Sequence, residues 1–459
     1  MLEVKTKKEL AGYAHNMARG LSLVRYRNTI YIPADFETRE TDPAPDPERT
    51  MWIPLNREDL QMMAAEDYDV LFATDGELSS FIFMVAQNCQ QHRLVVPELL
   101  VRTHEGLRML DDKGALVEPH GGFVPNTLHP MLNTDEAAKK EVFDIVAGWL
   151  DSDEEADSLL THLATCLAPG YSAVKYVLLL GGGRNGKSTL MKMLSTLIGR
   201  DNISHVTRQD ISAQSPVVTE LNGKLLNLVY DGQAEYLKDS GAEKTLIAGE
   251  PYAIRRLYES TPTMVQTTAL YVEGLQHEPK TKDKSTALQK RLVRFQFPNV
   301  YALNIPFERR MLQEDRLGAF LSLLIDRYVR EDEVAERLQP TSKALELQYE
   351  HMYTNSLGLQ FLKYLVETDG LAAILGVQTT ELGARFKAWR VRENDLSSWT
   401  QPAIDEQFAP LLDSERKSIR TPDGPRKVRV ITSLKTEAQA FLDSLEGSED
   451  DNLEEVVGD

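Results

Sequence analysis

The feature that most constrains the fold is a glycine-rich run of the pattern G-x-x-x-x-G-K-[ST]. Its residues are Gly181, Gly182, Gly183, Arg184, Asn185, Gly186, Lys187, Ser188 and Thr189. The apolar run YVLLL, typical of a strand buried on both faces, precedes it, and the helical pattern TLMKMLSTLIG follows it. In this context glycines let backbone N–H groups surround a phosphate at a helix start. We expect Lys187 to neutralise the β- and γ-phosphates of ATP and Ser188 to ligate Mg²⁺. The alternative is a structural turn at a strand end.

A carboxylate that suits the metal follows the next apolar run. The segment KLLNLVYD ends in Asp231, where a carboxylate at a neighbouring strand end would hold Mg²⁺ and its water. Gly232 follows instead of a second acid, so Gln233 and Glu235 are candidate auxiliaries. An ordinary aspartate at the end of a strand remains the alternative.

Composition excludes several classes of protein. Only two cysteines occur, Cys89 and Cys166, which excludes disulfide scaffolds and zinc ribbons. No run approaches the ~18 apolar residues of a membrane span, and no targeting segment is evident. We therefore expect a cytoplasmic protein. The formal net charge of −19 argues against broad coating of nucleic acid, so any such site must be a local basic feature.

The chain is long enough for about three domains. Between residues 177 and 300, apolar runs alternate with helical segments, which predicts an α/β core with a mostly parallel sheet. Farther on, three helical patterns and two short runs around TPDGP predict a winged helix. We expect an N-terminal α+β accessory domain over 1–130, a helical preface over 131–175, the core over 176–340, a winged-helix-like domain over 341–440, and an acidic, disordered tail over 441–459.

The combination of spaced motifs resembles superfamily 3 helicases of the phage and plasmid primase-helicase type. The resemblance covers roughly Glu105 to Tyr328 and includes the G-x-N-G-K-S-T ending of the loop. Its further elements are Asp231, Lys244, Gly249-Glu250, Arg255, Asp283-Lys284-Ser285 and Lys290-Arg291-Leu292. The resemblance implies an AAA+ P-loop ATPase core with ATP and Mg²⁺ as cofactors. No primase part is recognised.

One position departs from the family pattern. In YVEGLQHEP, Glu273 stands where the resemblance places a sensor asparagine. A carboxylate donates no hydrogen bond to the γ-phosphate unless it is protonated. Either Glu273 acts on the attacking water, or a residue such as Gln266 or Thr268 is the sensor.

Basic residues mark three further candidate sites. Arg291 suits an arginine finger that reaches a neighbouring subunit, with a plain salt bridge as the alternative. Arg255 and Arg256, with Tyr258, would lie near a hairpin tip that grips single-stranded DNA; a solvated strand edge is the alternative. In the C-terminal part, a basic wing would contact duplex DNA, or the domain only packs. Its residues are Arg416, Lys417, Arg420, Arg426, Lys427 and Arg429.

The resemblance implies an ATP-driven DNA helicase of a phage or other mobile element, acting in bacterial cytoplasm. It would form a hexameric ring and move 3′-to-5′ along one strand of single-stranded or forked DNA, with a primase or polymerase as a further partner. Two rivals remain open. A non-motor replication initiator would use ATP as a switch, and a P-loop nucleotide kinase would use the same loop.

Overall fold

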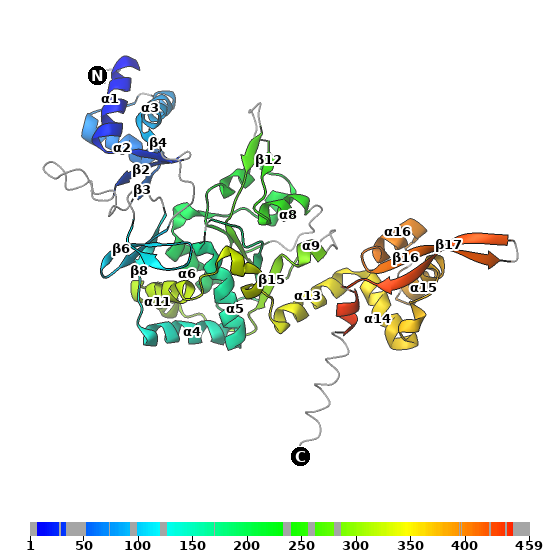
Figure 1. Ribbon diagram of the computed structural model, residues 1–459. Helices are drawn as coiled ribbons and strands as arrows, with labels where there is room; N and C mark the ends of the chain where they lie inside the picture. The colour runs from blue at the N-terminus through cyan, green and yellow to red at the C-terminus, as the bar shows by residue number, and fades with distance from the viewer. Residues whose placement is uncertain are drawn as a thin grey trace.

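A computed structural model describes most of the chain, in three parts that follow one another from the N-terminus to the C-terminus (Figure 1). They are a small part of helices and strands, a large central part around a parallel sheet, and a C-terminal part of helices and a long hairpin. The described residues are 7–26, 29–33, 52–72, 74–91, 99–119, 126–168, 170–232, 240–255, 262–279, 286–393, 395, 397–421, 424–436 and 438–443.

The N-terminal part joins three helices to a sheet of order β3-β2-β1-β4. Its elements are α1 (Lys7–Gly20), β1 (Val24–Tyr26), β2 (Thr29–Pro33), β3 (Trp52–Leu55), α2 (Arg57–Tyr68), α3 (Asp75–Asn88) and β4 (Gln90–Gln91). Ala14, Met17 and Phe81 lie in a hydrophobic core separate from that of the central part. This part therefore has its own core.

A second sheet, of order β7-β6-β5-β8, belongs to the central part. Its strands are β5 (Leu99–Thr103), β6 (Gly106–Leu110), β7 (Leu116–Val117) and β8 (Asn126–Met131). Leu99, Val101 and Leu128 are buried in the same core as the helices around the main sheet. The expected N-terminal domain over 1–130 is therefore too long, and the structure divides the chain before Leu99. Short strands in this region can be recognised in the sequence, but the sequence does not show that they pack on the core of the central part.

Three helices share the central core: α4 (Glu136–Leu150), α5 (Asp153–Ala164) and α11 (Glu314–Ile325). The acidic run DSDEEAD begins at the junction of α4 and α5 and continues into the first turn of α5. Ser152 caps this helix by accepting a hydrogen bond from the backbone of Glu155, and acids in the first turn favour the positive end of the helix dipole. Every residue from Leu317 to Leu324 is buried, so α11 is an internal helix.

The main sheet has five parallel strands in the order β10-β11-β14-β9-β15. They are β9 (Tyr176–Leu180), β10 (Ile203–Ser204), β11 (Leu226–Val229), β14 (Leu270–Leu275) and β15 (Leu292–Gln296). One face shares a core with α6 (Lys187–Ile198), and the other with α7 (Arg208–Ser212), α8 (Gly241–Ile247) and α9 (Thr286–Gln289). Strands covered on both faces explain their continuous apolar runs. The predicted α/β core with a parallel sheet is confirmed.

Shorter elements complete the central part. They are η2 (Thr165–Leu167), η3 (Arg200–Asn202), η4 (Pro216–Leu221), η5 (Glu331–Glu333), α10 (Ile305–Met311), α12 (Val334–Arg337), β12 (Tyr252–Ile254) and β13 (Thr263–Val265). Strands β12 and β13 pair antiparallel and project from the central part (Figure 1). This hairpin stands where the sequence predicted one.

The C-terminal part contains helices and a long antiparallel hairpin. Its elements are α13 (Ser342–Asn355), α14 (Leu357–Asp369), η6 (Leu371–Ala373), α15 (Thr379–Arg392), α16 (Gln401–Phe408), β16 (Leu412–Thr421) and β17 (Gly424–Leu434). Phe441 and Leu442 are buried in its core, so the expected tail over 441–459 begins too early. Residues 444–459 lie outside the described residues. No described helix is both long and apolar enough to cross a lipid bilayer.

Candidate functional site

The glycine-rich run forms the loop between β9 and α6, at the carboxyl edge of the main sheet. A side chain at Gly181 would place its Cβ 2.1 Å from Asn185 Nδ2 and 2.7 Å from the carbonyl oxygen of Phe297. Gly183 and Gly186 have φ values of +100° and +94°, in the left-handed region that favours glycine. The loop therefore needs glycine at these positions for steric reasons, and it opens directly into a helix N-terminus.

Lys187 lies in this loop with its amine turned toward the backbone. Its Nζ donates to the Gly181 carbonyl oxygen at 2.6 Å and to Asn185 Oδ1 at 3.1 Å. Burial lowers the pKa of Lys187, and the nearby Asp231 carboxylate partly offsets this. Asn185 in turn donates to the carbonyl oxygen of Phe297 at 3.2 Å. The amine is thus held by neutral acceptors, which an anionic phosphate would replace with a stronger partner.

A pocket of about 720 Å³ adjoins the loop, a volume within the range of small-molecule sites. The ring of Trp149 closes one side, and a Cβ on Gly186 would lie 2.5 Å from it. Tyr301 links the pocket walls, because its hydroxyl donates to the Gly148 carbonyl oxygen at 2.7 Å and its N–H donates to the Arg184 carbonyl oxygen at 2.7 Å. The lining residues are Asp144, Ile145, Gly148, Trp149, 183–189, 301–304, Phe307 and Glu308.

Asp231 lies at the same edge of the sheet as the loop. It is exposed and follows β11 by two residues, while β14 separates β11 from β9. Its carboxylate lies near enough to influence the charge of Lys187. Ser188, in the first turn of α6, is also exposed. Hydroxyl and carboxylate oxygens are the ligands that Mg²⁺ prefers, so the side chains of Ser188 and Asp231 fit the expected metal and would hold it.

Glu273 lies close to this edge, because a Cβ on Gly232, the residue after Asp231, would lie 2.1 Å from Glu273 Oε1. It sits within β14, is 1% exposed, and accepts a hydrogen bond from the Tyr176 hydroxyl at 3.2 Å. Burial raises its pKa to about 7, with Arg208 opposing and Glu243 adding to the rise. These neighbours belong to the sheet face opposite α6. The carboxylate is therefore bonded to Tyr176 and adjoins Gly232, and its action on the attacking water stays a prediction.

Gln276 is a candidate sensor that the sequence analysis missed. It is exposed and is the first residue after β14, where the Gly181 N–H donates to the Leu275 carbonyl oxygen at 3.1 Å. The two alternatives considered, Gln266 and Thr268, precede β14 and therefore lie toward its amino end. The available signal was the polar residue after Leu275, once the strand is taken to continue through Glu273.

Arg291 lies at the amino edge of the sheet. Its carbonyl oxygen accepts a hydrogen bond from the Tyr176 N–H at 2.8 Å, and its side chain donates to the Ala287 carbonyl oxygen. Its Nε is buried without a hydrogen-bond partner in the structure. The structure therefore separates Arg291 from the loop residues of the same chain.

The expected DNA-binding residues fall into two groups. Arg255 is exposed and follows β12 directly, at the tip end of the projecting hairpin, where Ile254 pairs with Thr263. Arg256 and Tyr258 lie outside the described residues, as do Gln233 and Glu235. Lys427 is exposed on β17, far along the chain from that hairpin.

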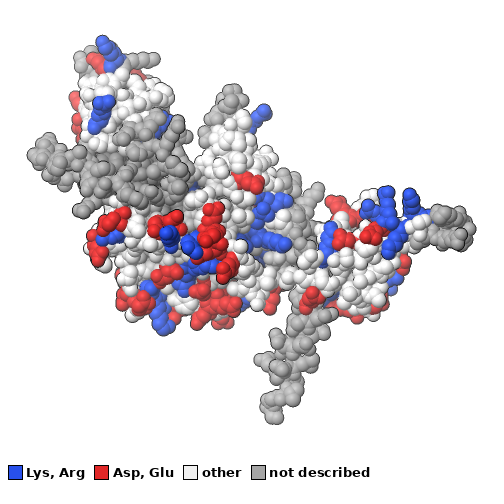
Figure 2. Space-filling view, in the orientation of Figure 1, with Lys and Arg blue, Asp and Glu red and all other residues white. Residues whose placement is uncertain are grey.

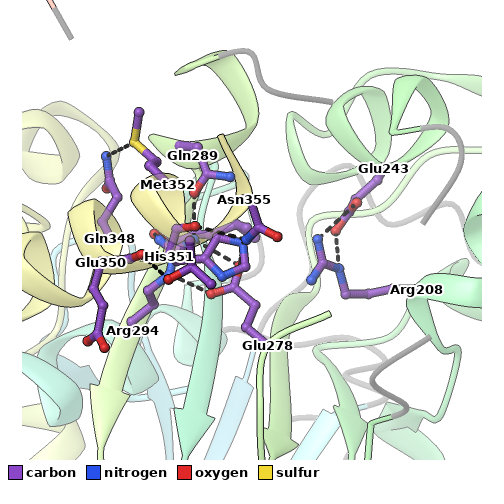
Figure 3. A network of polar contacts seen from close by, with 12 residues as sticks. Arg208, Glu243, Glu278, Gln289, Arg294, Gln348, Glu350, His351, Met352 and Asn355 are labelled. Atoms are coloured by element: carbon purple, nitrogen blue, oxygen red, sulfur yellow. Dashed lines mark hydrogen bonds and ion pairs between the residues drawn. The ribbon is translucent and has the colours of Figure 1, made fainter. Parts of the chain in front are cut away.

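A buried polar network ties α13 to the main sheet (Figure 3). Arg294 on β15 is 1% exposed and donates to the two carboxylate oxygens of Glu278 at 2.6 and 2.9 Å. His351 of α13 lies 3.3 Å from Glu278. Burial opposes ionisation, yet Arg294 and His351 hold the pKa of Glu278 below its ordinary value. The network fixes the segment that follows β14, which includes Gln276.

Comparisons with known proteins support the fold. A model for a family of unknown function (DUF5906) matches residues 179–291, and no curated protein matches the chain. An apo structure of the NrS-1 C-terminal region, in its A form, is 13% identical with a TM-score of 0.51, over 92% of this chain and 98% of that one. This chain shares the fold of the NrS-1 C-terminal region.

Two further structures are more distant. An apo structure of NrS-1 residues 305–718 has a TM-score of 0.49 at 12% identity, over 94% of this chain and 100% of that one. A JCV helicase structure with a bound small molecule has a TM-score of 0.28 at 15% identity, over 46% of this chain and 61% of that one.

Proposed function

We propose that this protein binds ATP with Mg²⁺ at the β9–α6 loop and hydrolyses it. The observation that carries the proposal is the meeting of Lys187 and Asp231 at one edge of a parallel sheet, beside a pocket large enough for a nucleotide. Lys187 would neutralise the β- and γ-phosphates, and Ser188 with Asp231 would hold the metal. Gln276, which is exposed directly after β14, would contact the γ-phosphate or the attacking water.

The site for ATP hydrolysis would be complete only where two subunits of an assembly meet. Arg291 lies at the sheet edge opposite the loop, so the cation it offers is available to another subunit's phosphate. This supports an AAA+-type core in a hexameric ring, with an arginine finger acting between subunits.

The work done with ATP would be unwinding of DNA during replication of a phage or mobile element in a bacterial host. The β12/β13 hairpin projects from the central part, and Arg255 at its tip end would grip one strand in the ring, helped by Arg256 and Tyr258. Travel would be 3′-to-5′, and a primase or polymerase would act beside it. The C-terminal helices and hairpin would form a winged helix.

The deciding experiment measures ATP turnover with and without single-stranded DNA, together with unwinding of forks that carry either a 3′ or a 5′ loading tail. A motor predicts stimulated turnover and unwinding of the 3′-tailed fork. ATP-dependent DNA binding without unwinding would instead establish the initiator. Phosphate transfer to an added nucleotide, with no response to DNA, would establish a kinase.

A further inference from the structure

The β16/β17 hairpin is a concentration of positive charge on an acidic protein. Its two strands carry six basic and two acidic residues, whereas the whole chain has a net charge of −19. Figure 2 shows Lys and Arg gathered on this hairpin beside its tip. Arg416, Lys417, Lys427 and Arg429 are all exposed, and none of them forms an ion pair with a described acidic residue.

The strand register places like charges together. Arg416 lies directly opposite Arg429, and Ser418 lies opposite Lys427. Residues two apart on a strand share a face, so Arg416, Arg429 and Lys427 form one cationic face. Like charges directly across a sheet destabilise it. Such an arrangement is expected where an anion neutralises it.

Only the base of the hairpin is packed. Leu412 and Ile431 are buried in the core formed with α14, α15 and α16, and Leu434 packs against it. Residues 415–418 are exposed, and the paired strands project away from the helices (Figure 1). The cationic face is therefore held in solvent by a rigid ladder rather than covered by the rest of the protein.

The helix next to the hairpin carries the opposite charge. In a helix-turn-helix, the second helix usually enters the major groove of DNA. Here α16 exposes Asp405 and Glu406, and its sequence, QPAIDEQF, has no basic residue. Carboxylates on that helix would be repelled by the phosphates that line a groove. The charges favour contact through the hairpin and not through α16.

The hairpin also favours duplex over single-stranded nucleic acid. Proteins that bind single strands combine basic grooves with aromatic side chains on which bases stack. Neither β16 nor β17 contains an aromatic residue. Cations without stacking platforms suit a backbone whose bases are already stacked in a helix.

We propose that the β16/β17 hairpin binds the phosphate backbone of duplex DNA without reading its sequence, while α16 stays out of the groove. The choice of DNA rests on the proposed function, but the binding itself needs no ATP. Arg416, Lys427 and Arg429 supply the phosphate contacts. The hairpin would hold the duplex ahead of or beside the ring.

The test uses the full chain without nucleotide and a labelled 20-base-pair duplex, with affinity measured by anisotropy between 50 and 200 mM salt. Replacing Arg416, Lys427 and Arg429 by Gln should lower affinity roughly tenfold or more and reduce the salt slope by about 2 to 3, because about one counterion is released per phosphate contact. Lys113, Lys140 and Arg200, exposed on the central part, provide a matched triple Gln control with the same charge change.

Several outcomes would overturn the proposal. An unchanged salt slope would mean that the hairpin does not contact the DNA. An equal loss of affinity in the control variant would mean that the effect comes from net charge alone. A tenfold preference between two unrelated duplexes would mean sequence readout. An equal loss of affinity for a single strand would remove the duplex selectivity. Because Gln relieves the Arg416–Arg429 repulsion, the melting temperature should not fall, and ATPase without DNA should be unchanged. If the wild-type protein had no ATPase activity, that result would count against the proposed function alone.

Discussion

Arg291 and Lys187 lie at opposite edges of the same parallel sheet. The Arg291 carbonyl oxygen meets the first residue of β9, whereas Lys187 Nζ bonds to Gly181, just past the last residue of β9. At about 3.3 Å per residue, a five-residue strand separates the two positions by roughly 17 Å. An arginine side chain does not span that distance along a sheet, so Arg291 does not reach the Lys187 loop of its own chain.

The first prediction follows from this separation. Arg291→Ala and Lys187→Ala damage opposite halves of one composite site, so each homogeneous variant should lack ATPase activity. Co-assembled rings of both variants contain some interfaces with an intact loop and an intact finger. Because a finger is worth roughly 10³ to 10⁵ in turnover, the mixture should exceed either variant alone by a wide margin. Steady-state phosphate release from mixed and unmixed samples measures it.

Titration of each variant into wild-type protein is the control for this mixing experiment. A linear decline indicates independent sites. With independent sites and no recovery in mixed rings, Arg291 would hold the fold and not contact phosphate.

A second prediction separates binding from hydrolysis. Lys187→Ala should lose both, because no other described cation lies within the loop apart from Arg184, whose side chain is exposed. Asp231→Asn should bind a fluorescent ATP analogue within a few-fold of wild type but lose roughly hundredfold or more in turnover, since it acts on metal and water. Loss of binding by Asp231→Asn, with a lower melting temperature, would show a structural aspartate.

The conformation of the glycine-rich loop could be predicted because it depends on local sequence. Glycines at positions 181, 183 and 186 with a strand before and a helix after specify the conformation whatever the rest of the chain does. The carboxylate at Asp231 was likewise predictable from the end of an apolar run. Both lie at the edge where parallel strands end.

The surroundings of Glu273 could not be predicted in this way. Glu273 interrupts an apolar run, and the sequence does not show that the strand continues through it to Leu275. A buried carboxylate is tolerated there because Tyr176 donates to it and Arg208 lies nearby, and both come from distant parts of the chain. The division before Leu99 was missed for the same reason, since it depends on which core the strands join.

A third prediction concerns Trp149. Its ring lines the pocket and lies against Gly186, so nucleotide binding should change its environment and its emission. Intrinsic fluorescence titrated with a non-hydrolysable ATP analogue should show a saturable change. Trp149→Phe should abolish most of that change, whereas Trp389→Phe, in the core of the C-terminal part, should retain it. A fluorescence change that survives Trp149→Phe would mean that the adenine base of the nucleotide does not lie against the Trp149 ring.

The fourth prediction tests Glu273 through pH. Its ordinary pKa is 4.5, and burial raises the pKa in the folded protein to about 7. Between these values the folded state binds a proton that the unfolded state lacks, so this group lowers stability as pH rises from 4.5 to 7. The full cost above pH 7 is about 3 kcal/mol, since each unit is worth about 1.4 kcal/mol.

Glu273→Gln removes the titration and keeps an acceptor for the Tyr176 hydroxyl. The variant should resemble wild type near pH 5 and become more stable than wild type by pH 8, by up to about 3 kcal/mol. Urea unfolding at several pH values measures this, with Glu336→Gln, exposed on α12, as a control that should show no such trend. ATPase activity should persist in Glu273→Gln. If turnover fell hundredfold while stability kept the wild-type pH dependence, the carboxylate would belong to the reaction, and the side chain would have to turn toward the loop when nucleotide binds.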